Sequence, residues 1–248
     1  MLFLYGNAIT TLPERLPSGL RHLAVGGNRL TSIPDTLWEL TGLETLNLAE
    51  NALTEISPAI GRLGSLRMLD LGHNQIASVP ATIGDLNLTD YLYLSDNGLT
   101  QVPAELGKLD RLAYLNLTDN HLESLPASLG DMAGLVELRL YNNRLETLPA
   151  TLTRLSRLRE LHLQGNRLRE LPPLPPALTH LDLRNNLLSR LPALPSGLLE
   201  LDLRNNRLRT LPDELPLGLR KLDLRWNKLA DEPPILDRLR SSGCMVLR

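Results

Sequence analysis

Residues 125–145 read LPASLGDMAGLVELRLYNNRL, a unit that the rest of the chain repeats. Leu138 and Leu140 form an apolar-x-apolar triplet, Asn143 follows three positions later, and Leu145 two positions after that. The same spacing surrounds eleven asparagines at intervals of 20, 21 or 23 residues, namely Asn7, Asn28, Asn51, Asn74, Asn97, Asn120, Asn143, Asn166, Asn186, Asn206 and Asn227. One such unit cannot bury its apolar residues alone, so the pattern predicts a solenoid of stacked short strands.

The asparagines have a structural interpretation. Where the chain turns away from each strand, backbone donors and acceptors lose their ladder partners, and a side-chain amide offers two donors and an acceptor in their place. We therefore expect a column of asparagines that satisfies the turns, beside a column of leucines that forms the core. Neither column is expected to carry specificity.

The repeats fall into two lengths. Units of 23 residues, such as Leu125 to Leu145, follow LPxxLGxLxxLxxLxLxxNxL and resemble the long-repeat type of intracellular leucine-rich-repeat proteins. Units of 20 residues, such as Leu191 to Asn206, follow LPxLPxxLxxLxLxxN and resemble those of bacterial effectors injected into host cells, some of which carry a ubiquitin-ligase domain. The resemblance covers essentially the whole chain. It implies an α/β solenoid, a curved horseshoe with a parallel β-sheet on the concave face and short helices or extended segments on the convex face.

The two lengths predict different convex sides. In the longer units, a segment such as 125–130 leaves room for a short helix after a proline. The shorter units return through proline-rich segments, 171–178 and 191–198, which favour extended geometry. We expect a helical or partly helical convex side between about Pro34 and Leu158, and an extended one afterwards.

The unbroken repeat predicts a single domain over residues 1–248, with about eleven repeats. Residues 231–248 are expected to form a C-terminal cap, with a short helix and a last strand in which Cys244 is a small buried apolar residue. No N-terminal cap is evident, because Met1 lies next to a strand. Either that edge is trimmed or left exposed, or a second copy covers it in a homodimer.

Composition narrows the function classes. The net charge of -2 and the lack of an arginine-lysine run argue against a nucleic-acid partner, and the apolar runs are too short to span a membrane. A single cysteine and a start without signal-peptide features favour a cytoplasmic protein, or one delivered into a host cytoplasm without a cleavable signal peptide. The preference for arginine over lysine, with much Ala, Gly and Pro, favours a bacterial origin.

Residues that flank the strand leucines point out of the concave sheet, and all five tyrosines and all five histidines fall at such positions. Tyr91, Tyr93, Tyr114 and Tyr141 gather over three consecutive strands. Tyrosine is enriched in protein interfaces because it supplies large, stiff contact area. We predict a partner-binding site at these four tyrosines, which shares its face with His121, Arg139 and His162; an ordinary strand surface is the alternative.

Charge also varies along the chain. Residues 1–124 contain 7 Lys and Arg against 14 Asp and Glu, whereas residues 125–248 contain 19 against 14. Two charged columns occupy the C-terminal repeats, the aspartates Asp182, Asp202 and Asp223 and the arginines Arg184, Arg204 and Arg225. The columns either neutralise each other, or the arginines, with Arg139, Trp226 and Lys228, hold an acidic partner.

Glu50, His73, Asp96 and Asp119 are candidate metal ligands, because they precede the repeat asparagine in four consecutive units. Carboxylates and imidazole bind Ca²⁺ or Zn²⁺, but a straight column does not converge on one ion. The sequence therefore predicts no metal and no cofactor.

No phosphate loop, metalloprotease helix motif or Gly-x-Ser-x-Gly elbow is present. The sequence predicts a non-enzymatic module that recognises a protein or peptide ligand on its concave face. Two alternatives stay open. One is the substrate-recognition repeat domain of a secreted bacterial effector, which could belong to a larger ubiquitin ligase; the other is a self-assembling structural subunit.

Overall fold

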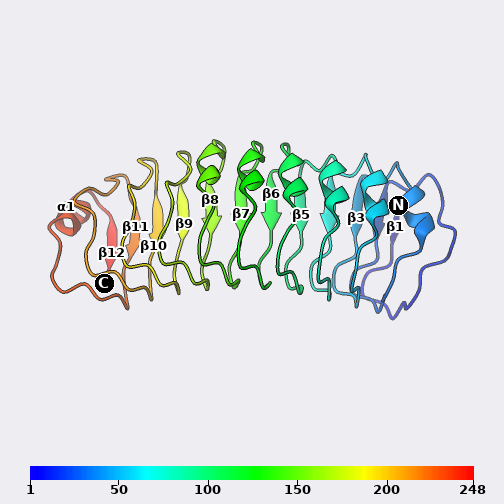
Figure 1. Ribbon diagram of the computed structural model, residues 1–248, viewed down its shortest axis with the longest axis horizontal. Coiled ribbons are helices and arrows are strands. Elements are labelled where there is room, and N and C mark those ends of the chain that lie inside the picture. Colours follow the sequence, from blue (N-terminus) through cyan, green and yellow to red (C-terminus); the bar gives the residue numbers. More distant parts are fainter.

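The computed structural model describes residues 1–248. Twelve short strands form one open parallel sheet in which the strands follow one another in chain order (Figure 1). The strands are β1 (Leu2–Phe3), β2 (His22–Ala24), β3 (Thr45–Asn47), β4 (Met68–Asp70), β5 (Tyr91–Tyr93), β6 (Tyr114–Asn116), β7 (Glu137–Arg139), β8 (Glu160–His162), β9 (His180–Asp182), β10 (Glu200–Asp202), β11 (Lys221–Asp223) and β12 (Met245–Leu247). The predicted α/β solenoid is confirmed.

Leucines set the register of the sheet. Leu115 at the centre of β6 pairs with Leu92 of β5 and Leu138 of β7, and all three are buried. Because successive strand residues point to opposite faces, the residues on either side of each central leucine face the concave surface. The buried apolar side chains form one cluster of 65 residues that runs the length of the stack.

The convex side carries six 3₁₀ helices of five residues each. These are η1 (Asp35–Glu39), η2 (Pro58–Arg62), η3 (Ala81–Asp85), η4 (Ala104–Lys108), η5 (Ala127–Asp131) and η6 (Ala150–Arg154). No helix follows until α1 (Ile235–Ser241), because the shorter repeats return through their proline-rich segments. The predicted change from a helical to an extended convex side is confirmed, and the short helices have 3₁₀ geometry.

The asparagine column has the expected role. Nδ2 of Asn120 donates to the carbonyl oxygens of Leu117 (3.2 Å) in its own repeat and Leu94 (2.9 Å) in the previous one. Its Oδ1 accepts from the backbone N–H of Leu99 at 3.0 Å. Each such amide therefore joins two repeats through groups that would otherwise be buried without partners.

The residue before each repeat asparagine has a left-handed backbone, with φ between 50° and 70° in all eleven repeats. Glycine fills this position in three repeats, and asparagine, aspartate, glutamate or histidine in seven. These types include the residues that tolerate positive φ best. In the last repeat the position is held by Trp226 (φ 60°), a bulky side chain for which this conformation is strained.

The two ends of the stack differ. At the C-terminus, helix α1 buries Leu236 and Leu239, and β12 pairs with β11. Cys244 is buried between these elements, as predicted, and burial raises the pKa of its thiol. At the other end, Phe3 of β1 is 65% exposed. None of the helices has the length and apolar character that crossing a bilayer requires.

Candidate partner-binding face

Three tyrosine rings form a contiguous group on the concave face, which we call the aromatic patch: Tyr91, Tyr93 and Tyr114. Tyr91 and Tyr93 flank the buried Leu92 on β5, and their rings stack with centroids 4.5 Å apart and planes 22° apart. Tyr114 is the register partner of Tyr91 on β6 and meets Tyr93 edge-on at 5.2 Å. Such pairs stabilise aromatic clusters beyond the area they bury, so the patch is a stiff platform.

Arg139 extends the aromatic patch towards the C-terminus. Its guanidinium carbon lies 5.3 Å from the centre of the Tyr114 ring, and its Nε donates to Oε1 of Glu137 at 2.6 Å. Burial raises the pKa of Tyr114, so its hydroxyl is a neutral donor at pH 7. The structure therefore brings three of the four predicted tyrosines together with Arg139. Tyr141 is partly exposed one turn beyond β7 and stacks on none of them, and His121 is exposed in the turn after β6.

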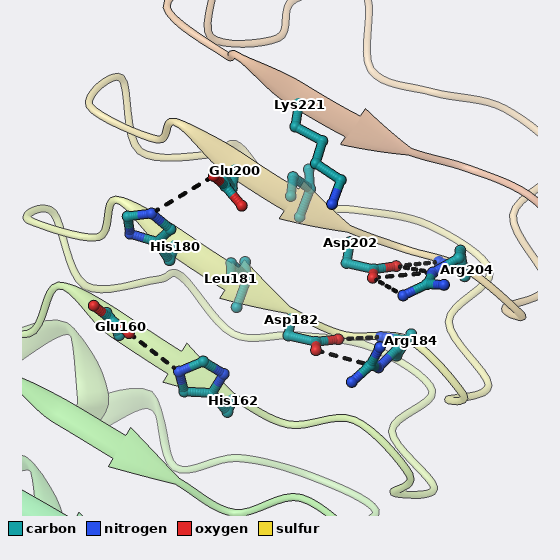
Figure 2. A pocket seen from close by; sticks show the side chains of 11 residues that line it. Glu160, His162, His180, Leu181, Asp182, Arg184, Glu200, Asp202, Arg204 and Lys221 are labelled. Atoms are coloured by element: carbon teal, nitrogen blue, oxygen red, sulfur yellow. Dashed lines mark hydrogen bonds and ion pairs between the residues drawn. The ribbon is translucent and has the colours of Figure 1, made fainter. Parts of the chain in front are cut away.

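A second feature of the face is a polar pocket of about 260 Å³ over β8 to β11, which we call the charged pocket (Figure 2). It gathers the predicted His162, Arg184 and Arg204 with the aspartates of the predicted column, and adds Glu160 and Glu200, which the sequence reasoning did not select. Its lining is Glu160, His162, His180, Leu181, Asp182, Arg184, Glu200, Leu201, Asp202, Arg204 and Lys221.

The arginines of the charged pocket are held by aspartates of their own repeats. Nη2 of Arg204 lies 2.6 Å from Oδ2 of Asp202, and Nε of Arg184 lies 3.3 Å from Oδ2 of Asp182 (Figure 2). Burial raises the pKa of Asp182, and the hydrogen bond and charge of Arg184 oppose that rise. Of the two alternatives for these columns, neutralisation of one by the other therefore describes the observed contacts.

Arg225 follows the same arrangement beside the pocket. Its Nη2 lies 2.7 Å from Oδ2 of Asp223, a side chain that is 1% exposed. Burial alone would raise the pKa of Asp223, but its hydrogen bonds with Arg225 and the charges of Arg225 and Arg204 outweigh burial and lower it. The guanidinium carbon of Arg225 also lies 5.4 Å from the ring centre of Trp226, which is 68% exposed.

The candidate metal ligands Glu50, His73, Asp96 and Asp119 do not converge on one point. Nδ1 of His73 lies 2.8 Å from Oδ2 of Asp96, and Oε1 of Glu50 accepts from the hydroxyl of Tyr5 at 2.6 Å. The fourth member, Asp119, accepts from Nδ2 of an asparagine in the next repeat. Only His73 and Asp96 therefore contact each other, while Glu50 and Asp119 bond to residues outside the four.

A different group brings potential metal ligands closer together. One ligand atom from each of Glu137, Glu160 and His162 lies within 4.8 Å of the others. The strand register explains this, because Glu137 and Glu160 pair across β7 and β8. The sequence of one repeat does not reveal this group of three ligands, but an alignment of consecutive repeats would. Arg139 bonds to Glu137 at 2.6 Å and places a positive charge where a cation would bind.

Family models agree with this architecture. A model described as a leucine-rich repeat region matches residues 58–225, and two leucine-rich-repeat models match residues 18–76 and 219–232. The chain is a leucine-rich-repeat protein. No curated protein matches the sequence.

Solved leucine-rich-repeat structures resemble this one closely. A leucine-rich-repeat protein of Leptospira interrogans is 30% identical, with a TM-score of 0.76 over 97% of this chain and 70% of that chain. YopM from Yersinia enterocolitica is 29% identical, with a TM-score of 0.63 over 98% of this chain and 57% of that chain. The plant peptide hormone receptor RGFR1, solved in complex with RGF2, is 26% identical, with a TM-score of 0.72 over 96% of this chain and 45% of that chain.

Proposed function

We propose that this protein is a non-enzymatic recognition module that binds a protein or peptide on its concave face, with the aromatic patch at the centre of the interface. The observation that carries the proposal is the group of three half-buried tyrosine rings on adjacent strands. Tyrosine supplies large contact area at a low cost in conformational entropy, and its hydroxyl gives directed hydrogen bonds.

Two structurally similar repeat proteins were solved in complexes with other proteins or peptides, which supports the proposal. RGFR1 was solved in complex with RGF2, and the FLRT2 repeats in an octameric complex with Latrophilin 3 and Unc5D. Within this chain, the hydrogen bond with Glu137 fixes Arg139 beside Tyr114 before any partner arrives. Side chains that are already ordered lose little entropy on binding, which favours affinity. The proposed interface extends from the aromatic patch to Tyr141, His121 and the charged pocket.

The test is capture of partners from bacterial and host lysates by the wild type and by a Tyr93→Ala/Tyr114→Ala double variant. The matched control is Tyr5→Ala, which removes a tyrosine that is 55% exposed and lies outside the patch. We expect the control to retain a partner that the double variant loses, while circular dichroism shows all three proteins folded. Equal capture by the double variant would refute a role for the aromatic patch.

A second candidate is the substrate-recognition part of a bacterial effector that acts in a host cytoplasm without a cleavable signal peptide. The 20-residue repeats and the 29% identity to YopM favour it. Export of this chain from a secreting bacterium into cultured host cells, followed by capture of a host protein, would support this candidate. Capture of bacterial proteins only would count against it.

Self-assembly is a third candidate, favoured by the exposed Phe3 on the edge strand β1. Light scattering of the wild type and a Phe3→Glu variant decides it: a homodimer that the variant abolishes supports self-assembly, and a monomeric wild type excludes it. We also propose that residues 1–248 form one domain, closed at its C-terminal end by residues 231–248.

A further inference from the structure

The last residue of a concave strand repeatedly accepts a hydrogen bond from the backbone N–H two positions later. Oδ1 of Asn47 accepts from Ala49 at 3.0 Å, and Oδ1 of Asn116 accepts from Thr118 at 3.1 Å. Oδ1 of Asp202 makes the same bond at 3.1 Å. Asparagine and aspartate therefore perform this backbone role alike, and the bond does not require a negative charge.

Where the last residue of a concave strand is an aspartate, an arginine usually follows two residues later. Asp182, Asp202 and Asp223 are followed by Arg184, Arg204 and Arg225, and each pair forms an ion pair. The two asparagines are followed by uncharged residues. One strand departs from this correspondence: β4 ends in Asp70, and the residue two positions later is Gly72.

Asp70 consequently has hydrogen bonds but no ion-pair partner. Its Oδ1 accepts from the N–H of Gly72 at 3.0 Å and its Oδ2 from Nδ2 of Asn47 at 3.3 Å, and it takes part in no ion pair. Burial raises the pKa of the Asp70 carboxyl, opposed by the Gly72 hydrogen bond and the charge of His73, while the charge of Glu50 raises it further. A half-buried carboxylate without a cation is costly unless something neutralises it.

Asp70 borders the aromatic patch. Its register partner on β5 is Tyr93. Elsewhere in the chain, arginine side chains bind both a carboxylate and an aromatic ring. Nε and Nη2 of Arg204 donate to the Asp202 carboxylate, and the guanidinium of Arg139 lies over the Tyr114 ring. Residues 1–124, with 7 Lys and Arg against 14 Asp and Glu, also favour a cationic partner.

We propose that an arginine side chain of the protein partner occupies the place that Arg204 and its equivalents occupy in the later repeats, with its guanidinium bonded to Asp70 and packed against Tyr93. The inference rests on the proposed function and specifies the chemistry of its ligand. Arginine is favoured over lysine because its planar fork matches a carboxylate and packs on an aromatic ring. Because Gly72 has no side chain, the position beside Asp70 is open to a side chain of the partner.

The first test is selection from a library of random peptides displayed on phage, with immobilised wild type, Asp70→Asn and Asp85→Asn as targets. Asp85→Asn removes one negative charge from the exposed end of η3 on the convex side and controls for net charge. We expect arginine to be enriched among peptides retained by the wild type and by Asp85→Asn, and not among those retained by Asp70→Asn.

A second test occupies the proposed arginine position beside Asp70 with a side chain of the protein itself. Gly72→Arg supplies the arginine that the later repeats carry, and Gly72→Gln adds a long uncharged side chain as the matched control. A Cβ at Gly72 would lie 3.1 Å from Oγ of Ser95 and 3.3 Å from Oδ1 of Asp70, a fit that small shifts of these side chains relieve. Gly72→Arg is expected to lose the arginine preference, whereas Gly72→Gln should retain more of it.

The affinity of a selected peptide measures the contact directly. Replacement of its arginine by citrulline, which keeps the shape and removes the charge, should weaken binding to the wild type about tenfold to a hundredfold and binding to Asp70→Asn hardly at all. Peptides that depend on Tyr93 and Tyr114 but show no arginine enrichment would overturn this inference and leave the proposed function standing. If the wild type retains no peptide that the Tyr93→Ala/Tyr114→Ala variant loses, both fail.

Discussion

Nδ2 of Asn120 lies 2.9 Å from the carbonyl oxygen of Leu94, a residue 26 positions earlier in the chain. Asn120 is 3% exposed, so Asn120→Ala leaves buried carbonyls and the N–H of Leu99 without partners. We expect a loss of about 3 kcal/mol in the free energy of unfolding. Urea denaturation measures it, with the exposed Asn87→Ala as the control, which should change stability by less than about 0.5 kcal/mol. Similar losses in both variants would contradict a special role for the column.

Gly107 packs against the next repeat so closely that an added Cβ would lie 2.2 Å from the backbone oxygen of Ser128. The convex helices η4 and η5 would have to separate to admit a methyl group. We expect Gly107→Ala to lower the free energy of unfolding by about 3 kcal/mol, the cost of severe overpacking. In Gly42→Ala the new Cβ meets no atom within 4 Å, so this control should be nearly neutral in the same denaturation experiment.

Trp226 has a φ of 60° at a position where the two preceding repeats have asparagine. A left-handed backbone costs most residues about 1–2 kcal/mol, and asparagine less. Trp226→Asn should therefore stabilise the protein by about 1 kcal/mol, as measured by thermal and urea denaturation. Trp226→Leu removes the same ring but keeps the strain, so it should give no such gain. If Trp226→Leu stabilises equally, strain at this residue is not the cause.

Asp223 should support stability at neutral pH. Its pKa in the folded protein lies below the ordinary value of 3.8, so its contribution is complete above pH 3.8 and is lost as the pH falls through the lower, folded value. Asp223→Asn should therefore lower the free energy of unfolding by about 1–3 kcal/mol at pH 7, with a smaller difference at pH 2.5. Denaturant titrations at the two pH values check this. A difference that does not change with pH would argue against the ionic contribution.

Asp70 should have the opposite effect on how stability depends on pH. Because its pKa in the folded protein is raised above 3.8, the folded state binds more protons than the unfolded state between these two values, and stability falls as the pH rises through that window. Asp70→Asn keeps an acceptor for the Gly72 N–H, as Asn47 does for Ala49. The variant should be more stable than the wild type at pH 7 and equal to it near pH 3. Lower stability at pH 7 would show that the carboxylate supports the fold.

Most of the fold could be predicted because its information lies in spacing. The central strand leucines and the repeat asparagines recur at intervals that alone set the sheet and its turns, and the proline-rich segments at 171–178 and 191–198 predict where the convex helices stop. The left-handed residue before each asparagine was missed, although Gly6, Gly27 and Gly165 carried the signal. Glutamate, histidine and tryptophan at the same position concealed it.

The candidate site could be predicted only as far as the face on which its residues lie. Alternation along a strand places Tyr91 and Tyr93 on one side of the sheet, but the stacking of their rings depends on side-chain torsions that no spacing encodes. The pairing of Arg204 with Asp202 was one of two open alternatives, because adjacent columns of opposite charge fit both internal neutralisation and a charged partner. The sequence shows that Asp70 is followed by Gly72 and not by arginine, but the absence of any other ion-pair partner is a property of the folded structure.

Every strand of the sheet pairs only with the strand before it and the strand after it, and the convex helices meet only their immediate neighbours. No contact between these elements joins distant repeats, so tension applied to the two termini is carried in series through one interface after another. The molecule should therefore lengthen under load like a coil spring, one turn at a time, and recover its length as the turns close again.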